Sequence, residues 1–123
     1  QFITRHKVNS SVVAAFEKEL SEIYAAGATV AEVPRVSYFA EKAHLTPGYF
    51  GDLIKRETGN TAQEIITLRI IAEAKRRLAS TDADISSIAY DLGFQYPQHF
   101  TRLFKRVSGK SPKVFRNEFC PDN

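Results

Sequence analysis

The sequence predicts an all-α fold of about seven helices, and three observations support this prediction. Apolar residues recur every three or four positions, as at Phe100, Leu103, Phe104 and Val107, which is the spacing of one helix face. Ser, Thr, Pro and Gly stand where such segments begin and end. No segment alternates apolar and polar residues over the length of a strand.

The first half of the chain contains three predicted helices, at residues 10–26, 36–43 and 46–58. Residues 1–9 show no clear pattern. Gly27 is the expected end of the first helix. Thr46 and Pro47 indicate an N-cap followed by proline at the first helical position, and Gly59 ends that third helix.

The second half contains four predicted helices, at residues 62–79, 85–92, 96–108 and 112–119. Thr61 and Glu64 form a capping box at the start of the longest one. Ser111 is the expected cap of the last helix. Tyr96 stands where a Ser, Thr or Asp cap is usual, so we expect an irregular first turn in the helix of residues 96–108.

Two parts of the chain repeat each other at a spacing of 50 residues. The identical pairs are Pro47 and Pro97, Phe50 and Phe100, Leu53 and Leu103, Lys55 and Lys105, Arg56 and Arg106, and Gly59 and Gly109. Each copy contains a short helix, a turn and a second helix with a free outer face, which is a helix-turn-helix. A helical repeat that packs only against itself is the alternative.

One long helix, at residues 62–79, is expected to join the two helix-turn-helix units. At 1.5 Å per residue it is about 27 Å long, and successive major-groove faces of B-DNA lie about 34 Å apart. We therefore expect the two second helices, residues 46–58 and 96–108, to enter adjacent major grooves on one face of a duplex.

The charges are distributed unevenly along the chain. Between Leu92 and Asn117 there are six basic residues and no acidic residue. Such a local excess is typical of a surface that binds a polyanion. The net charge of +3 is otherwise modest.

Other classes of protein fit the sequence less well. No pair of carboxylates, phosphate-binding loop or nucleophile–base arrangement indicates an enzyme. We expect no cofactor and no metal site, because the three histidines are scattered. No apolar run is long enough for a membrane span, and the single cysteine, Cys120, excludes an intramolecular disulfide. A helical protein-interaction module that kept this fold without reading DNA remains the alternative.

The stretch from Leu68 to Arg116 resembles the C-terminal signature of AraC/XylS-type bacterial transcription regulators. The residues that carry the resemblance are Arg69, Ala74, Leu78, Ile85, Ile88, Ala89, Gly93, Phe94, Phe100, Phe104, Lys105, Gly109, Ser111, Pro112 and Arg116. The first unit also fits, so the resemblance covers about residues 34–119. It implies tandem helix-turn-helix units, binding to double-stranded DNA, and a separate sensing or dimerising region that precedes this domain.

The resemblance also sets the expected domain organisation and partners. We expect a DNA-binding domain at residues 34–123 and, at residues 1–33, an N-terminal segment with a helix. The chain begins at Gln1 and contains no Met, so we expect it to be part of a longer protein. RNA polymerase is an expected partner of the full regulator, any ligand or dimerisation region lies outside this chain, and the cytoplasm and its nucleoid are the expected location.

The side chains expected to read bases lie mainly in the second unit. A helical wheel places Gln98 and Arg102 at the centre of the exposed face, and the resemblance implies base or groove contacts for both and for His99. Arg102 suits a guanine and Gln98 an adenine or a backbone group. The full set of base-contact candidates is Gln95, Gln98, His99 and Arg102, with Tyr49 and Asp52 in the first unit.

Cations and hydroxyls around these positions are expected to bind phosphates, which fixes register without reading sequence. The phosphate-contact candidates are Thr46, Lys55, Arg56, Thr101, Lys105, Arg106 and Lys110. In the first unit, Gly48, Gly51 and Asp52 occupy positions where the family usually has long hydrogen-bonding side chains. We therefore expect the second unit to carry more of the affinity and specificity.

Overall fold

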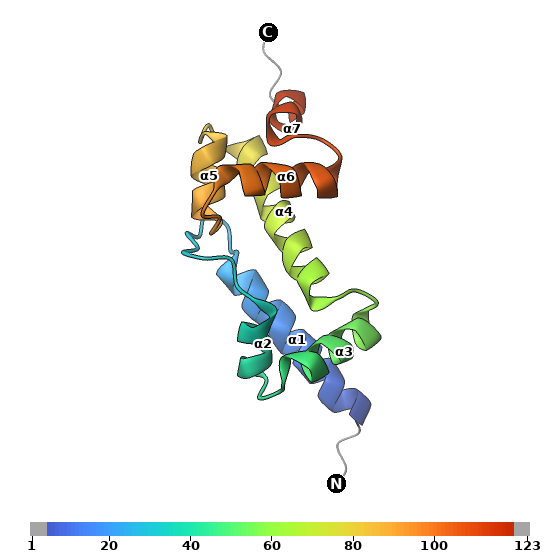
Figure 1. The fold of residues 1–123 in the computed structure, drawn as a ribbon. Coiled ribbons are helices and arrows are strands. Elements are labelled where there is room, and N and C mark those ends of the chain that lie inside the picture. Colours follow the sequence, from blue (N-terminus) through green and yellow to red (C-terminus); the bar gives the residue numbers. More distant parts are fainter. Residues whose placement is uncertain (1–4, 120–123) are drawn as a thin grey trace. The chain divides into compact units, whose positions relative to one another are not determined.

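A computed structural model describes residues 5–119, and this part of the chain forms seven helices and no strand (Figure 1). The helices are α1 (Arg5–Ile23), α2 (Val36–Lys42), α3 (Pro47–Thr58), α4 (Ala62–Ser80), α5 (Ile85–Asp91), α6 (Pro97–Ser108) and α7 (Pro112–Phe119). The all-α prediction is confirmed, and the ends of α2 to α7 agree with the predicted ones to within one residue. Cys120 lies outside the described residues.

These helices form two compact units, each of which contains one helix-turn-helix pair. The first unit contains residues 5–22 and 34–67, and thus α2 and α3. The second contains residues 23–33 and 68–119, and thus α5, α6 and α7. The N-terminal segment up to residue 33 therefore contributes residues to both units.

The core of the first unit is built from aromatic rings. Phe16 of α1 packs edge-on against Phe39 of α2, with ring centroids 4.8 Å apart, and against Phe50 of α3 at 5.4 Å. Phe50, Leu53 and Ile54 of α3 are almost completely buried. Burial of rings of this size supplies much of the stabilisation of so small a unit, and it holds α3 with one face inward.

The helix α1 begins and ends earlier than the sequence predicts. It starts at Arg5 instead of Ser10, because tertiary contacts support its polar first turns: Asn9 is buried, and His6 lies 3.9 Å from Glu57 of α3. It ends at Ile23 and does not continue to Gly27. The carbonyl of the next residue, Tyr24, instead accepts a hydrogen bond from Arg69 at 2.9 Å.

The predicted caps form as expected. The Thr46 hydroxyl accepts a hydrogen bond from the Tyr49 amide at 3.2 Å. At the start of α4, Thr61 and Glu64 each accept from the other's amide, at 3.0 Å and 2.7 Å. These bonds satisfy amides that have no partner inside their own helix, so they fix where each helix begins.

The core of the second unit contains Phe100 and Phe104 of α6, which are fully buried. Val107, on the same predicted apolar face, is more exposed, with an exposed fraction of 37%. The ring of Phe115 in α7 packs against Phe104 at a centroid distance of 5.6 Å. Burial of α6 thus falls on Phe100 and Phe104 and decreases towards Val107 in its last turn.

The connector after α1 is an integral part of the second unit. The Val30 amide donates to the carbonyl of Asp91 at 2.7 Å, and the Tyr24 hydroxyl donates to that of Leu92 at 2.9 Å. Gly93 has a φ of +101°, and a Cβ there would lie 2.7 Å from the Val33 nitrogen. Glycine is therefore required where the connector crosses the turn of the second helix-turn-helix.

A buried ion cluster joins the same connector to α4. The Glu73 carboxylate accepts hydrogen bonds from Arg76 and Arg77 at 2.9 Å and 2.7 Å, and from the Gly27 amide at 3.4 Å. Burial alone would raise the pKa of Glu73, but these hydrogen bonds outweigh it and lower the pKa to about 2. Arg77 also donates to the carbonyl of Ala28 at 2.6 Å, so the buried charges of Glu73 and Arg77 both have partners.

Candidate nucleic-acid interface

The outer face of α6 is polar and exposed. Phe100 and Phe104 hold the opposite face in the core, and this fixes the direction of the remaining side chains. The exposed residues of the helix and the turn before it include the four base-contact candidates of the second unit and two phosphate candidates: Gln95, Gln98, His99, Arg102, Lys105 and Arg106. Thr101 is half-buried beside them. The structure therefore brings most of the predicted residues of the second unit together on α6, with Gln95 in the turn before it and Lys110 beyond its end.

Several of these side chains have no partner among the residues that the structure describes. In residues 5–119, the side chains of Gln98, Arg102, Lys105 and Arg106 make no hydrogen bond or ion pair. An unpaired guanidinium or amide on a convex helix can form two parallel hydrogen bonds with a base edge. The face is thus available for a ligand without first breaking internal bonds.

The first turn of α6 departs from that of α3, as the sequence predicts. Tyr96 occupies the N-cap position with a φ of −127°, and its side chain makes no capping hydrogen bond. The His99 amide bonds instead to the Tyr96 carbonyl at 3.0 Å, three residues back. The Tyr96 and His99 rings pack edge to face, with centroids 5.4 Å apart and planes at 71°.

The outer face of α3 carries fewer side chains. Tyr49, Asp52 and Arg56 are exposed on it. A Cβ added at Gly48 or Gly51 would meet no atom within 4 Å, so both positions are open space. The structure thus places the candidates of the first unit on one helix, as expected, but leaves its backbone uncovered between them.

Two of the predicted phosphate ligands already have internal partners. Lys55 donates to the Gly59 carbonyl at 2.9 Å, and Lys110 pairs with Glu118 of α7 at 2.6 Å. The Thr46 hydroxyl is occupied as a cap acceptor but retains its proton as a donor. These residues would have to exchange or extend internal bonds in order to contact DNA.

The basic residues near the end of the second unit do not all face solvent. Arg116 turns inward and donates to the carbonyls of Leu78 and Thr81, at 3.0 Å and 3.2 Å, so it stabilises the packing of α7. Lys113 is exposed. Tyr96 was not among the predicted site residues, although an aromatic ring at an N-cap position was a visible signal.

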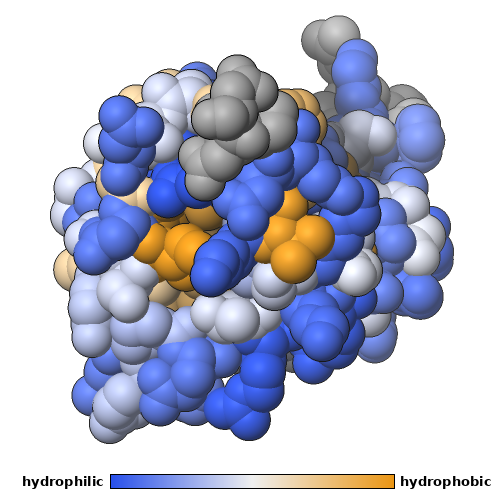
Figure 2. Space-filling model, turned by 90° about the horizontal axis from the view of Figure 1, so that it is seen from above, coloured by the Kyte–Doolittle hydropathy of each residue, from blue (hydrophilic) through white to orange (hydrophobic). Residues whose placement is uncertain are grey.

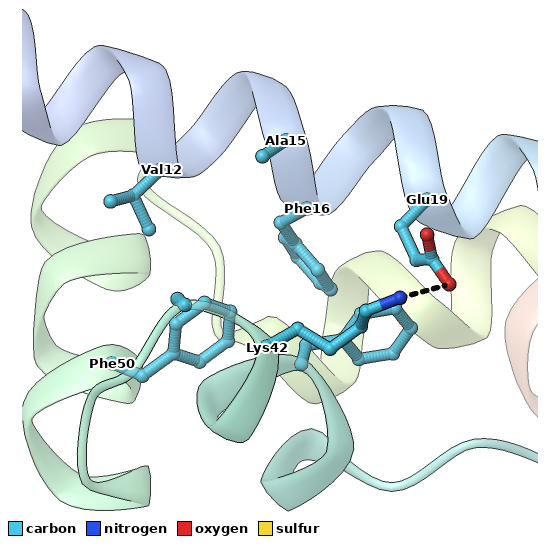
Figure 3. A pocket seen from close by; sticks show the side chains of 8 residues that line it. Val12, Ala15, Phe16, Glu19, Lys42 and Phe50 are labelled. Atoms are coloured by element: carbon cyan, nitrogen blue, oxygen red, sulfur yellow. Dashed lines mark hydrogen bonds and ion pairs between the residues drawn. The ribbon is translucent and has the colours of Figure 1, made fainter.

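A small hollow in the first unit is another feature that could hold a ligand (Figure 3). It has a volume of about 170 Å³ and is lined by side chains of α1, α2 and α3, including Val12, Phe16 and Phe50. The ammonium of Lys42 lies 3.4 Å from the Glu19 carboxylate at its rim. The Tyr38 hydroxyl donates to the same carboxylate at 2.7 Å, and this bond, followed by the charge of Lys42, lowers the pKa of Glu19.

The rest of the described surface shows no metal-binding arrangement. Within residues 5–119, no three His, Cys, Asp or Glu side chains gather to hold a metal ion. No helix in this part of the chain is both long and apolar enough to cross a membrane. The face drawn in Figure 2 is mostly hydrophilic, with small hydrophobic areas between the polar side chains.

Comparison with known proteins identifies the family. The model of a helix-turn-helix domain matches residues 39–118. The uncharacterized HTH-type transcriptional regulator YobQ of Bacillus subtilis is 32% identical over 87 residues, which cover 71% of this chain and 36% of that protein. The chain spans about a third or less of the length of the curated relatives it matches.

Solved structures show the same fold. The C-terminal domain of AraT, a response regulator from Geobacillus stearothermophilus, has a TM-score of 0.78 at 23% identity, over 87% of this chain and 84% of that one. The DNA-binding domain of the transcriptional factor AdpA, solved with a target DNA, has a TM-score of 0.71 at 22% identity, over 90% and 91%. The chain belongs to the AraC-type helix-turn-helix family of DNA-binding domains of transcriptional regulators.

Proposed function

We propose that this chain is the DNA-reading part of a longer bacterial transcription regulator, and that α6 carries most of its affinity and specificity. In this proposal α3 and α6 enter adjacent major grooves of the bound duplex, and α3 contributes less. The observation that carries the proposal is the row of exposed α6 side chains without internal partners, backed by the buried Phe100 and Phe104.

The residues of α6 divide by chemistry into two groups. Arg102 is suited to donate two hydrogen bonds to O6 and N7 of a guanine, and Gln98 to pair with an adenine. His99 and Gln95 would contact neighbouring bases. Lys105, Arg106, Thr101 and Lys110 would bind phosphates, which supplies affinity that depends on salt and not on sequence.

The first unit would contact DNA in a different way. Asp52 can accept a hydrogen bond from N4 of a cytosine but repels phosphates. Tyr49 is exposed beside it, and Thr46 and Arg56 would meet phosphates, whereas Lys55 would do so only by leaving the Gly59 carbonyl. With so few long side chains, α3 would rely on the amides at its N-terminus, where an anion is favoured.

The remaining expectations concern the regulator as a whole. Because the relatives are about three times as long as the matched segment, we propose that a ligand-binding or dimerising region lies outside this chain and that RNA polymerase is a further partner. A protein that reads bacterial DNA would act in the cytoplasm, on the nucleoid. We propose no catalytic activity and no cofactor, and the family favours DNA binding over a pure protein-interaction module.

The experiment that tests this function is a selection of bound sequences from random duplexes. We expect an enriched site with one strongly defined half and one weakly defined half, and binding that weakens steeply as salt rises. In the Arg102→Ala variant, the preference should relax at one position of the strong half. If the protein is not retained on any duplex at low salt, the proposal that it binds DNA is contradicted. If the two halves of the selected site are equally well defined, the dominance of α6 is contradicted.

A further inference from the structure

We propose that Tyr96 is a DNA-contacting and positioning residue, whose ring holds His99 in its reading orientation and whose hydroxyl donates a hydrogen bond to a backbone phosphate. This inference rests on the proposed function, because it assumes that α6 lies in a major groove. It adds a residue that neither the repeat nor the basic charges select.

The position of Tyr96 is unfavourable for the stability of α6. The matching residue of the first unit is Thr46, whose hydroxyl caps α3 by accepting from the Tyr49 amide at 3.2 Å. At the start of α6 the Tyr96 side chain makes no such bond. Ser, Thr, Asp and Asn stabilise a helix at this position and aromatic residues do not, so tyrosine costs stability here.

Burial does not compensate for this cost. The exposed fraction of Tyr96 is 48%, whereas the core rings Phe100 and Phe104 are fully buried. Within residues 5–119, the ring contact that Tyr96 makes is the one with His99. Tyr96 thus stands where a cap would stabilise the helix, and its half-exposed ring packs on a base-contact candidate.

The edge-to-face contact restricts the imidazole of His99. Its ring lies 5.4 Å from that of Tyr96 at an angle of 71°, an arrangement that aromatic rings favour. A side chain that is already ordered loses less conformational entropy when it binds. Tyr96 therefore prepares His99 for the groove, in the way that a supporting residue prepares a contact residue.

Tyr96 stands at the N-cap of α6, and the N-terminal end of a helix attracts phosphate. The amides of a helix N-terminus point outward and carry partial positive charge. Pro97 follows Tyr96 and lacks an amide, and the His99 amide is engaged with the Tyr96 carbonyl. A phenol hydroxyl at this point adds a donor where two of the first three helical residues, Pro97 and His99, offer none.

The test separates the hydroxyl, the ring and the cap by comparing Tyr96→Phe with Tyr96→Ser. Tyr96→Phe keeps the ring and should leave the base preference intact. It should lower the affinity for all duplexes by roughly tenfold, because one hydrogen bond to a charged acceptor is lost. Tyr96→Ser should restore the cap and raise the melting temperature, yet weaken binding and flatten the preference at the base pair that His99 contacts. In a His99→Ala background, Tyr96→Ser should cause no further change in preference.

The matched control is Tyr90→Ser, which removes an equally exposed tyrosine from α5. It should change neither the affinity nor the preference. Unchanged affinity in Tyr96→Phe would overturn the phosphate contact, and unchanged preference in Tyr96→Ser would overturn the positioning of His99. The Arg102→Ala variant is measured alongside. If it and the Tyr96 variants all bind as the wild type does, the proposed reading by α6 fails. If only Arg102→Ala loses affinity and base preference, the inference about Tyr96 alone is refuted.

Discussion

The ammonium of Lys55 donates a hydrogen bond to the carbonyl oxygen of Gly59 at 2.9 Å, just beyond the end of α3. This bond satisfies a carbonyl of the left-handed turn that terminates the helix. Lys105 occupies the matching position of α6 and has no such bond in the described part of the chain. Two helices with the same C-terminal sequence pattern therefore use this lysine differently, and Lys105 is the freer cation.

This difference predicts unequal salt dependence in two matched variants. Lys105→Ala should lower the affinity for all duplexes by a similar factor and reduce the slope of log affinity against log salt by about one unit. Lys55→Ala should leave the slope almost unchanged and lower the melting temperature slightly. Dissociation constants at several salt concentrations measure both slopes. Equal reductions in the two variants would show that Lys55 leaves Gly59 to bind a phosphate.

Arg102 and Asp52 provide a comparison of the two reading helices. Arg102→Ala should cost about 1–3 kcal/mol of discrimination at one base pair, which is the usual value of a bidentate contact. Asp52→Ala removes a carboxylate that repels phosphates, so the affinity should stay the same or rise. Titration of a selected site and of single-base variants measures both effects. A loss from Asp52→Ala as large as that from Arg102→Ala would reverse the proposed order of the two units.

Local sequence signals predicted most of the fold because the interactions behind them are local. The caps at Thr46 and Thr61 involve residues three positions away, and Gly59 needs only its own left-handed conformation. The repeat then assigned the same arrangement to α5 and α6. Helix ends that depend on such bonds can be located from sequence alone.

The features that sequence could not predict depend on residues far apart in the chain. The start of α1 is held by burial of Asn9, and Arg116 reaches the carbonyl of Leu78, 38 positions away. The pairing of Lys110 with Glu118 depends on how α7 folds back. Charge counting treated both basic residues alike as solvent-exposed cations, because it carries no information about which carbonyl or carboxylate lies nearby.

The open positions on α3 predict opposite effects on stability and binding. Gly48→Ala and Gly51→Ala should each stabilise the fold by about 0.5–1 kcal/mol, because glycine weakens a helix interior and the added Cβ meets nothing within 4 Å. If the α3 backbone approaches DNA closely, both variants should nevertheless bind more weakly. Urea unfolding and a binding titration measure the two effects.

The control for these glycines is Gly59→Ala, which should destabilise the protein because its φ of +84° is strained for any residue with a Cβ. Unchanged affinity in both Gly48→Ala and Gly51→Ala would mean that α3 does not approach the duplex with its bare face.

The Glu73 cluster predicts how stability depends on pH. Its pKa is about 2 in the folded protein, below the ordinary value of 4.5. The ionised carboxylate therefore contributes stability that is fully present above about pH 4.5 and is lost as the pH falls through 2, in total about 3 kcal/mol. Glu73→Gln should thus destabilise the protein by a similar amount at pH 7, because it leaves Arg77 buried without an anion.

That penalty should shrink at pH 3, because the unfolded wild-type chain is then protonated at Glu73, whereas the folded carboxylate stays ionised and folding has to release that proton. Urea unfolding at pH 7 and pH 3 gives the difference between Glu73→Gln and the wild type at each pH. Glu17→Gln serves as the matched control, because Glu17 is exposed on α1 and has no partner in residues 5–119, so its effect should be small at both values. A penalty for Glu73→Gln that is the same at pH 3 and pH 7 would mean that the lost stability comes from packing of the side chain and not from its charge.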